Sequence, residues 1–561
     1  MSRASPAWRP MGTRAASNEP SIRPPGAQAR AVHGRLAGVF DRLADPRAYP
    51  WFGALLVLYN LAGGSFLHNW GPVDYWEHLA AIDALARDPM RPVAPYFASA
   101  QSSHLFTPYH LAWALVAKLT TLRGHVLASL MAAVNTILFL TGARALARRL
   151  TGDPRPALWF VLTLLFFWLR PWRWSGFYDF GLLPLTAAYP YWFAFSMTLL
   201  MLGRTGAGAG TLAEAVLIAS GVALVFLTHP LTGSFLAVAL AVRGLSQRGT
   251  ARGARWAALV APAAGMVAAL AWPYFPVAGA MAGAPRFADL SFAGDWVSFY
   301  DKFPLRLLPA GLGAVYFVRA IRTRTWDWVG WTLLVVSAIY VLNPVSVRSA
   351  FLSRYVIFLA FMLHCGIVRA LSLSLGWGTD RSAMNPRLAR AILAGYLLVL
   401  APAAALELRT STGWLGTPWA NLPPSPAGDR DVREFMRRFA AYAAFVGPSD
   451  VIMAGMTESY VLPAVLGGHV VGVPHGSPFL HDATARREAV SRFFDPHTTA
   501  DERRDLLDDY AVTRVLVPRA DAPRLAGLET PRTRILFADD YYELRAVVGA
   551  GRGDAPRGRA P

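Results

Sequence analysis

Three ionisable side chains stand within five residues of one another, directly after the first apolar run of the chain. Asp74, Glu77 and His78 follow a hydrophobic segment from Trp51 to about Leu67. Charged groups at the end of a membrane span are costly to keep there and usually mark a functional site. Because Asp74 and Glu77 are three residues apart, they share one face if a helix has begun. A carboxylate near lipid can act as a general base, so the segment predicts carboxylate chemistry at the membrane surface.

The same three residues allow two other interpretations. Two carboxylates and a histidine can hold Mg²⁺ or Mn²⁺, and Glu77 and His78 are then the candidate metal ligands. Alternatively, Asp74 is the N-cap of a helix over 75–87 and Glu77 lies in its first turn, at the positive end of the helix dipole. The capping role is compatible with a catalytic one.

Two histidines further along the chain are candidate substrate-binding residues. His104 opens an aromatic segment that ends at His110. The two histidines either bind a phosphate or a metal, or the segment anchors the chain in the membrane interface. His229 stands where an apolar segment ends, and Pro230 follows it. A histidine in a membrane needs a partner, so His229 either faces the site or is a hydrogen-bonded core residue.

Four arginines stand near apolar segments on the side where arginine is scarce. Arg348 and Arg354 flank the start of the tenth apolar segment, and their guanidinium groups can bind a phosphate bidentately. The alternatives are binding of phospholipid headgroups or a structural ion pair. Arg170 and Arg173 are candidates for phosphate binding on the same grounds, but the three tryptophans around them are also typical of an aromatic belt.

The composition is that of a membrane protein. Of the 561 residues, 54% are hydrophobic and 16% are charged, whereas about a quarter of a soluble chain is charged. The net charge is +19. The arginines fall in short clusters between apolar runs, as the positive-inside rule expects, so we expect membrane lipids as partners and no nucleic acid. The lone cysteine, Cys365, cannot form an internal disulfide.

The apolar runs predict a polytopic α-helical membrane protein with about eleven spans. Their positions are 50–67, 125–142, 156–170, 186–203, 211–228, 231–242, 255–279, 305–319, 328–343, 353–370 and 389–407. The segment 109–121 is shorter and carries Lys118, so we expect it to be re-entrant or to lie in the interface. With a cytoplasmic N-terminus, every arginine-rich loop falls on the cytoplasmic side.

The chain changes character after the last apolar segment. We expect a disordered basic cytoplasmic tail over 1–49, a multi-span domain over 50–408, a linker over 409–428, an extracytoplasmic α/β domain over 429–548 and a second tail over 549–561. In the α/β domain, short apolar runs predict strands at 451–454, 469–473, 514–517 and 534–537, with helices at 458–466, 483–493 and 499–510 between them. Thr499 and Glu502 predict a capping box.

This layout resembles the GT-C class of membrane glycosyltransferases, which use polyprenyl-phosphate sugars. A first span is followed by an outer loop that opens with an acidic residue, here Asp74, and many spans lead to an extracytoplasmic C-terminal domain. In that domain, the segments Thr457–Ala464 and Gly467–Val471 resemble the tail of bacterial members of the class.

The resemblance implies an inverting membrane glycosyltransferase of the plasma (inner) membrane. Asp74 is then the base for the hydroxyl of a glycan, lipid or protein acceptor, and the donor is a polyprenyl-phosphate-linked sugar. A divalent cation, Mg²⁺ or Mn²⁺, assists some members, with Glu77 or His78 as its ligands here. A role for Arg348 and Arg354 at the donor phosphate is a physical inference, because a phosphate leaving group needs nearby positive charge.

Two other functions stay open at the level of the sequence. The number of spans and a helix break at His229 and Pro230 are compatible with a transporter or flippase of a lipid-linked substrate. Two features argue against a transporter: the chain has no repeated halves, and its polar groups collect on one face of the membrane. The third possibility is a non-catalytic membrane assembly protein whose C-terminal domain binds a partner.

Overall fold

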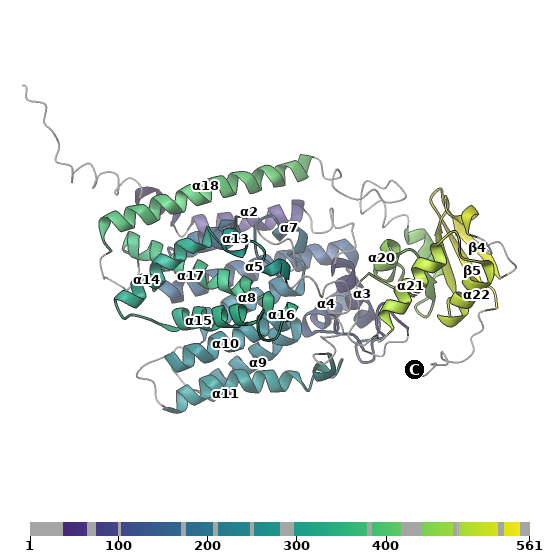
Figure 1. The fold of residues 1–561 in the computed structure, drawn as a ribbon, viewed down its shortest axis with the longest axis horizontal. Helices are drawn as coiled ribbons and strands as arrows, with labels where there is room; N and C mark the ends of the chain where they lie inside the picture. The colour runs from purple at the N-terminus through teal and green to yellow at the C-terminus, as the bar shows by residue number, and fades with distance from the viewer. Residues whose placement is uncertain are drawn as a thin grey trace, which may run out of the picture.

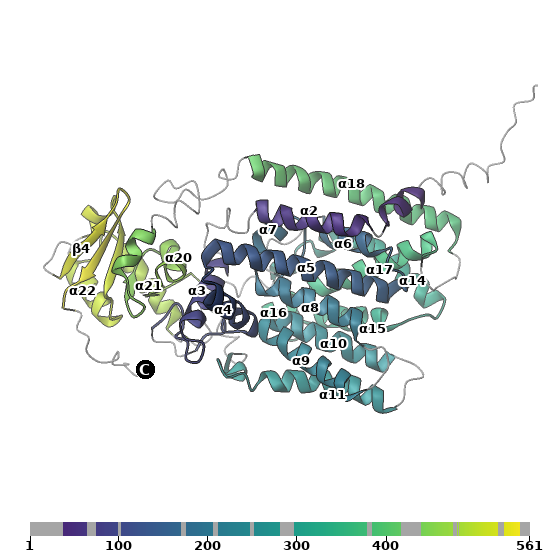
Figure 2. The ribbon, with the colours of Figure 1, turned by 180° about the vertical axis from the view of Figure 1, so that it is seen from behind.

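The computed structural model describes residues 37–45, 47–63, 74–98, 102–169, 176–205, 211–246, 252–280, 297–377, 384–416, 439–474, 480, 482–525 and 532–549. Most of the described chain forms a bundle of helices whose axes run along the longest dimension of the molecule (Figure 1). A small sheet domain stands at one end of this bundle, and the reverse view shows the same arrangement (Figure 2). Arg170 and Arg173 lie outside the described residues.

Each predicted apolar segment contains a helix in the described part of the chain. The helices of the bundle are α2 (Ala48–Gly63), α5 (Gly124–Thr151), α6 (Ala157–Phe166), α8 (Pro190–Arg204), α9 (Leu212–Thr228), α10 (Pro230–Ser246), α11 (Arg252–Ala269), α14 (Ala314–Arg322), α15 (Trp328–Leu342), α17 (Val356–Leu375) and α18 (Pro386–Gly416). The short helices α7 (Leu183–Thr186), α13 (Phe303–Arg306), η3 (Ala310–Gly313) and α16 (Ala350–Ser353) connect them.

Three stretches of the described chain are helical, long and apolar enough to cross a membrane: Gly124–Thr151, Ala350–Leu375 and Pro386–Arg409. Several others are apolar but shorter, such as Leu212–Thr228 and Trp328–Leu342. The number of eleven spans therefore stays a prediction. The three long apolar helices agree with the membrane character that the sequence predicts for this domain.

Several predicted boundaries differ from the structure. Helix α11 ends at Ala269 rather than continuing to 279, because Pro273 and Pro276 follow and proline cannot donate a helical hydrogen bond. The predicted span 305–319 is broken between α13 and α14, where Pro309 precedes the tight turn η3. Helix α18 continues to Gly416, so the predicted linker 409–428 begins as helix.

Small residues bring the central helices together. A Cβ atom on Gly142 of α5 would lie 2.7 Å from the backbone oxygen of Ser196 in α8. One on Gly203 of α8 would lie 2.6 Å from the backbone of Ala145 in α5. The two backbones approach so closely that only glycine fits at both contacts, which is how membrane helices commonly pack.

Two amphipathic helices close the end of the bundle that faces the sheet domain. Helix α3 (Asp74–Arg87) buries one face through residues such as Tyr75, Trp76 and Leu79. Helix α4 (Pro108–Thr120) packs against it, and Thr107 caps its first turn. Figures 1 and 2 both place α3 and α4 between the bundle and the sheet domain.

The arginine-rich loops gather at the opposite end of the bundle. The guanidinium of Arg155 lies over the ring of Trp377, whose indole nitrogen donates to Asp41. Arg144 lies over the ring of Tyr49, near the start of α2. Both views place the beginning of α18 at this same end (Figures 1 and 2). The two ends thus differ in charge, which agrees with the expected orientation; which end faces the cytoplasm stays a prediction.

The C-terminal domain is a five-stranded mixed sheet with helices, as its strand and helix patterns predict. Its strands are β1 (Val451–Met453), β2 (His469–Val470), β3 (Arg514–Pro518), β4 (Thr533–Ala538) and β5 (Tyr542–Val547), in the order β2-β1-β3-β5-β4. Strand β1 pairs in parallel with β2 and β3, and β5 is antiparallel to β3 and β4. The helices are α20 (Met456–Leu466), α21 (Ala483–Phe494) and α22 (Ala500–Asp509), with short η4 (Ala443–Phe445) and η5 (Ala522–Arg524).

One strand of this domain lacks a clear signal in the sequence. Strand β5 carries Glu543 and Arg545 among its apolar residues, so its pattern does not look like that of a buried strand. In the fold the two charges form an ion pair at 2.6 Å, which allows Arg545 to be buried. The predicted capping box is confirmed: Thr499 accepts from the backbone of Glu502, and the Glu502 side chain accepts from that of Thr499.

Candidate active site

The first turn of α3 is the centre of the candidate site. The helix begins at Asp74, and both Asp74 and Glu77 lie in its first turn, where the helix dipole favours negative charge. The backbone N–H of Tyr75 donates to the hydroxyl of Tyr189 at 3.1 Å. Tyr189 is the N-terminal flanking residue of α8, which Pro190 starts. The start of α3 is thereby attached to the core of the bundle.

Glu77 is half-buried where α3 faces the C-terminal domain. Its side chain accepts a hydrogen bond from the hydroxyl of Tyr460, which belongs to α20 of the C-terminal domain. Burial raises the pKa of Glu77 to about 8, and the neighbouring charge of Asp74 acts in the same direction. The Tyr460 hydrogen bond opposes both effects. With its pKa raised in this way, Glu77 binds a proton more readily than a carboxyl group in water does.

His78 starts a chain of hydrogen bonds that leads into α4. Its Nδ1 lies 3.0 Å from Nε2 of His110, and Nδ1 of His110 lies 2.8 Å from the hydroxyl of Thr107. Burial and the charge of His110 lower the pKa of His78, whereas Asp74 raises it. Because His110 occupies Nδ1, only Nε2 of His78 can contact a substrate or a metal.

The structure shows no preassembled cluster of metal ligands among the residues that it describes. In the part of the chain that the structure describes, no group of three or more His, Cys, Asp or Glu side chains is arranged to hold a metal ion. Glu77 is hydrogen-bonded to Tyr460, and Nδ1 of His78 is engaged by His110. The predicted metal role of Glu77 and His78 therefore stays a prediction, and we derive no chemical step through a metal.

Histidines from several separate elements lie near His78. Asp74, His104, His110 and His229 each lie close enough to His78 for their charges to act on its imidazole. His104 comes from the turn before α4.

His229 ends α9 in an extended conformation, and Pro230 begins α10. The break holds the imidazole at the end of the bundle. There its Nδ1 lies 2.7 Å from the hydroxyl of Thr232, and its ring lies 6.1 Å from that of Tyr191.

Of the two predicted arginines, Arg354 lies near the site. Its charge acts on His229, and its guanidinium lies 5.6 Å from the ring centre of Phe299. Arg348 is exposed, and its Nε donates to the carbonyl of Pro344 in its own loop at 3.3 Å. Among the described residues, Arg348 has no contact with the other candidate residues.

Three tyrosines of the site are absent from the sequence-based set. Tyr96, Tyr189 and Tyr460 are all buried, and each lies close enough to Asp74 to be affected by its charge. Tyrosine is common at membrane interfaces, so its occurrence there carries no specific signal. Tyr460 lies in the Thr457–Ala464 segment, which supplied the only indication in the sequence.

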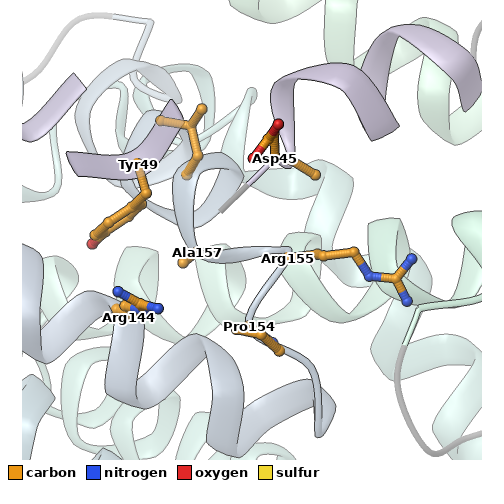
Figure 3. Close-up of a pocket in the computed structure, with 8 residues that line it drawn as sticks. Asp45, Tyr49, Arg144, Pro154, Arg155 and Ala157 are labelled. Atoms are coloured by element: carbon orange, nitrogen blue, oxygen red, sulfur yellow. The ribbon is translucent and has the colours of Figure 1, made fainter. Parts of the chain in front are cut away.

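A small pocket of the described structure lies far from these residues (Figure 3). It is lined by Asp45, Tyr49, Arg144, Arg155 and their apolar neighbours, at the arginine-rich end of the bundle. The Arg155 side chain there is already paired with Asp153 at 2.6 Å. This pocket is therefore not the candidate site, which lies at the other end of the bundle.

Comparison with solved structures identifies the fold. The arabinofuranosyltransferase AftD from mycobacteria matches with a TM-score of 0.53 over 91% of this chain and 40% of its own length, at 13% identity. The chain thus spans less than half of AftD. The oligosaccharyltransferase of Archaeoglobus fulgidus in the apo form matches with a TM-score of 0.44 and 13% identity, over 84% of this chain and 70% of that one. ArnT from Cupriavidus metallidurans bound to undecaprenyl phosphate matches with a TM-score of 0.47 and 12% identity, over 90% of this chain and 98% of that one.

The match to AftD shows that this chain shares its fold, which is the fold of the GT-C class. The predicted resemblance is confirmed at the level of the fold. No protein-family model and no curated protein matches the sequence.

Proposed function

We propose that this chain with the GT-C fold is a glycosyltransferase that moves a sugar from a polyprenyl-phosphate donor to an acceptor hydroxyl. The observation that carries the proposal is the gathering of ionisable side chains at one end of the fold. Asp74, in the first turn of α3, and His229, at the α9–α10 break, both act electrostatically on His78. Arg354, between α16 and α17, acts on His229 in the same way. A soluble domain covers the same end (Figure 1).

Asp74 is the general base of the proposed reaction. As the acceptor oxygen forms its bond to the anomeric carbon of the sugar, Asp74 takes the hydroxyl proton. The bond between the anomeric carbon and the phosphate oxygen breaks, and polyprenyl phosphate leaves with the electron pair. A single displacement of this kind inverts the configuration at the anomeric carbon.

Arg354 and His229 bind the donor phosphate in this proposal. A guanidinium offers several N–H groups in a plane, which matches the oxygens of a phosphate. The positive charge of Arg354 stabilises the negative charge that develops on the leaving group. His229 lies beside it, with its Nδ1 engaged by Thr232, and presents Nε2 to the same phosphate.

The reaction takes place at the extracytoplasmic face of the inner membrane. The support is the separation of charge: the arginine-rich loops lie at the end of the bundle opposite α3 and the C-terminal domain. Under the positive-inside rule, the arginine-rich end is cytoplasmic. The polyprenyl chain of the donor then lies among membrane lipids, and its phosphate reaches Arg354 at the boundary with water. The acceptor is a glycan, a lipid or a protein.

The test is a deletion strain complemented with variants of the full chain. Lipid-linked sugars and envelope glycans are compared by mass spectrometry, and we expect the deletion strain to accumulate a polyprenyl-phosphate sugar and to lack one glycan product. Wild type restores the product. Asp74→Asn keeps the size of the side chain and removes the base, so we expect a loss of about 10²–10⁴-fold in activity.

Two results would contradict the proposal. Glu488→Gln, at an exposed position of α21, is the control and should restore the product like wild type. If Asp74→Asn also restores it within a few-fold at equal protein level, Asp74 is not the base. If deletion leaves every polyprenyl-phosphate sugar and glycan unchanged, the glycosyltransferase function itself is rejected.

A further inference from the structure

The C-terminal domain is bound directly to the chain segment that carries Asp74 and Glu77. The hydroxyl of Tyr96, in the segment after α3, donates to the carbonyl of Tyr460 at 2.8 Å. The backbone N–H of Val470 donates to the carbonyl of Tyr96 at 2.8 Å. Arg87, the last residue of α3, donates to the carbonyl of Gly467 at 3.0 Å. Both views place α20 against α3 (Figures 1 and 2).

The interface is also apolar and closely packed. A single hydrophobic core continues from the bundle into the domain, and it includes Trp76 of α3, Tyr96 and Tyr460. Gly467 has φ +79°, and a Cβ atom there would lie 2.6 Å from the guanidinium of Arg87. A larger residue at this position would be strained and would displace Arg87. The domain is thus held in one position on α3 by packing as well as by hydrogen bonds.

The hydroxyl of Tyr460 is the point at which this interface reaches the candidate site. Tyr460 is fully buried, its ring lies 6.1 Å from that of Tyr96, and its hydroxyl donates to the Glu77 side chain. The charge of Asp74 also acts on Tyr460. The aromatic ring is therefore fixed by the domain, while its polar end contacts the carboxylate next to the proposed base.

We infer that Tyr460 is a positioning residue that acts through Glu77, and that the C-terminal domain is thereby a structural part of the active site. This inference rests on the proposed function and extends it to a segment that follows α3 by more than 350 residues in sequence. Glu77 and Asp74 share the first turn of one helix, so a displaced Glu77 changes the surroundings of the base. Small displacements of catalytic groups reduce rates strongly even when substrate binding is intact.

The first measurement compares Tyr460→Phe with wild type in the full chain, using a dilution series of the deletion strain's lipid extract as donor. Phenylalanine keeps the buried ring and removes only the hydroxyl. We expect kcat to fall about tenfold while the apparent KM stays within about twofold. Tyr442→Phe is the matched control, because it removes a buried hydroxyl whose partner is the carbonyl of Tyr542. It should leave kcat unchanged.

The second measurement is a double-mutant cycle with Glu77→Gln. If Tyr460 acts through Glu77, adding Tyr460→Phe to Glu77→Gln reduces kcat by much less than it does in wild type. A purely structural role of Tyr460 gives additive effects instead. The inference is overturned if the two effects add, or if Tyr460→Phe keeps kcat within twofold of wild type. Both outcomes require an active wild type, so they differ from failure of the proposed function, in which wild type itself transfers no sugar.

Discussion

At the scale of single residues, the candidate site depends on side chains that are distant in sequence. Asp74 and Glu77 come from one helical turn, whereas His229 and Arg354 each stand next to a break between helices. A break at the end of the bundle lets a polar side chain point toward water while the flanking helices stay apolar. The polar groups of the site therefore lie where the two environments meet.

Arg354 provides the most direct test at this scale. We expect Arg354→Gln to raise the apparent KM for the lipid-linked donor at least about tenfold, because hydrogen bonds to charged groups contribute about 1.5–3 kcal/mol. Initial rates over a donor dilution series measure the effect. Arg348→Asn is the comparison, since Asn tolerates the positive φ of Arg348 (53°) and this residue is exposed. Equal effects of the two substitutions would exclude a specific role for Arg354.

At the scale of elements, helix packing positions the site. Helix α8 begins with Pro190 directly after Tyr189, whose hydroxyl accepts from the first turn of α3. Helix α8 itself is held against α5 through Gly142 and Gly203. A shift between α5 and α8 would therefore be transmitted to Tyr189 and to the start of α3.

The α5–α8 contact predicts a difference between two glycine substitutions. Gly142→Ala places a methyl group 2.7 Å from a backbone oxygen of α8, which cannot move without displacing the helix. Gly395→Ala in α18 meets only the Leu312 side chain, at 3.8 Å. Overpacking costs about 1–3 kcal/mol, so we expect Gly142→Ala alone to lower the thermal unfolding temperature in detergent. The packing argument fails if both variants unfold at the wild-type temperature.

At the scale of the whole molecule, the two ends of the bundle have different properties. One end carries arginine-rich loops and the small pocket of Figure 3, and the other carries α3, α4 and the sheet domain. The domain continues the hydrophobic core of the bundle, so it belongs to the same folded body. For a proposed reaction on an extracytoplasmic lipid-linked donor, this domain must face away from the cytoplasm.

Cysteine labelling in spheroplasts tests this orientation. The native Cys365 is fully buried and should not react, so the wild type is the blank. We expect Glu488→Cys, in the C-terminal domain, to react with a membrane-impermeant maleimide added outside spheroplasts. Arg148→Cys, at the arginine-rich end, should react only after the membrane is permeabilised. The reverse pattern would place the proposed site in the cytoplasm and contradict the extracytoplasmic reaction.

The sequence by itself determined that the chain has a large helical domain followed by a small α/β domain, and it located most of their helices and strands. Apolar runs located the helices of the bundle, and short apolar strands and the Thr499–Glu502 capping box located much of the C-terminal domain, because these signals are local. Local signals also explain the errors. The prolines after α11 and within 305–319 end helices inside apolar runs that look continuous. Strand β5 was missed because Glu543 and Arg545 make its sequence look exposed, although their ion pair allows Arg545 to be buried.

Only the tertiary structure decided which polar residues meet. Asp74 stood out from its neighbours in the sequence, whereas Tyr189 and Tyr460 looked like ordinary interface and core residues. Their proximity to α3 arises from the packing of α8 and from the docking of α20, and both contacts join residues more than a hundred positions apart. The tertiary structure also decided that Arg354, and not Arg348, lies near His229. The two arginines differ in burial, which the sequence does not show.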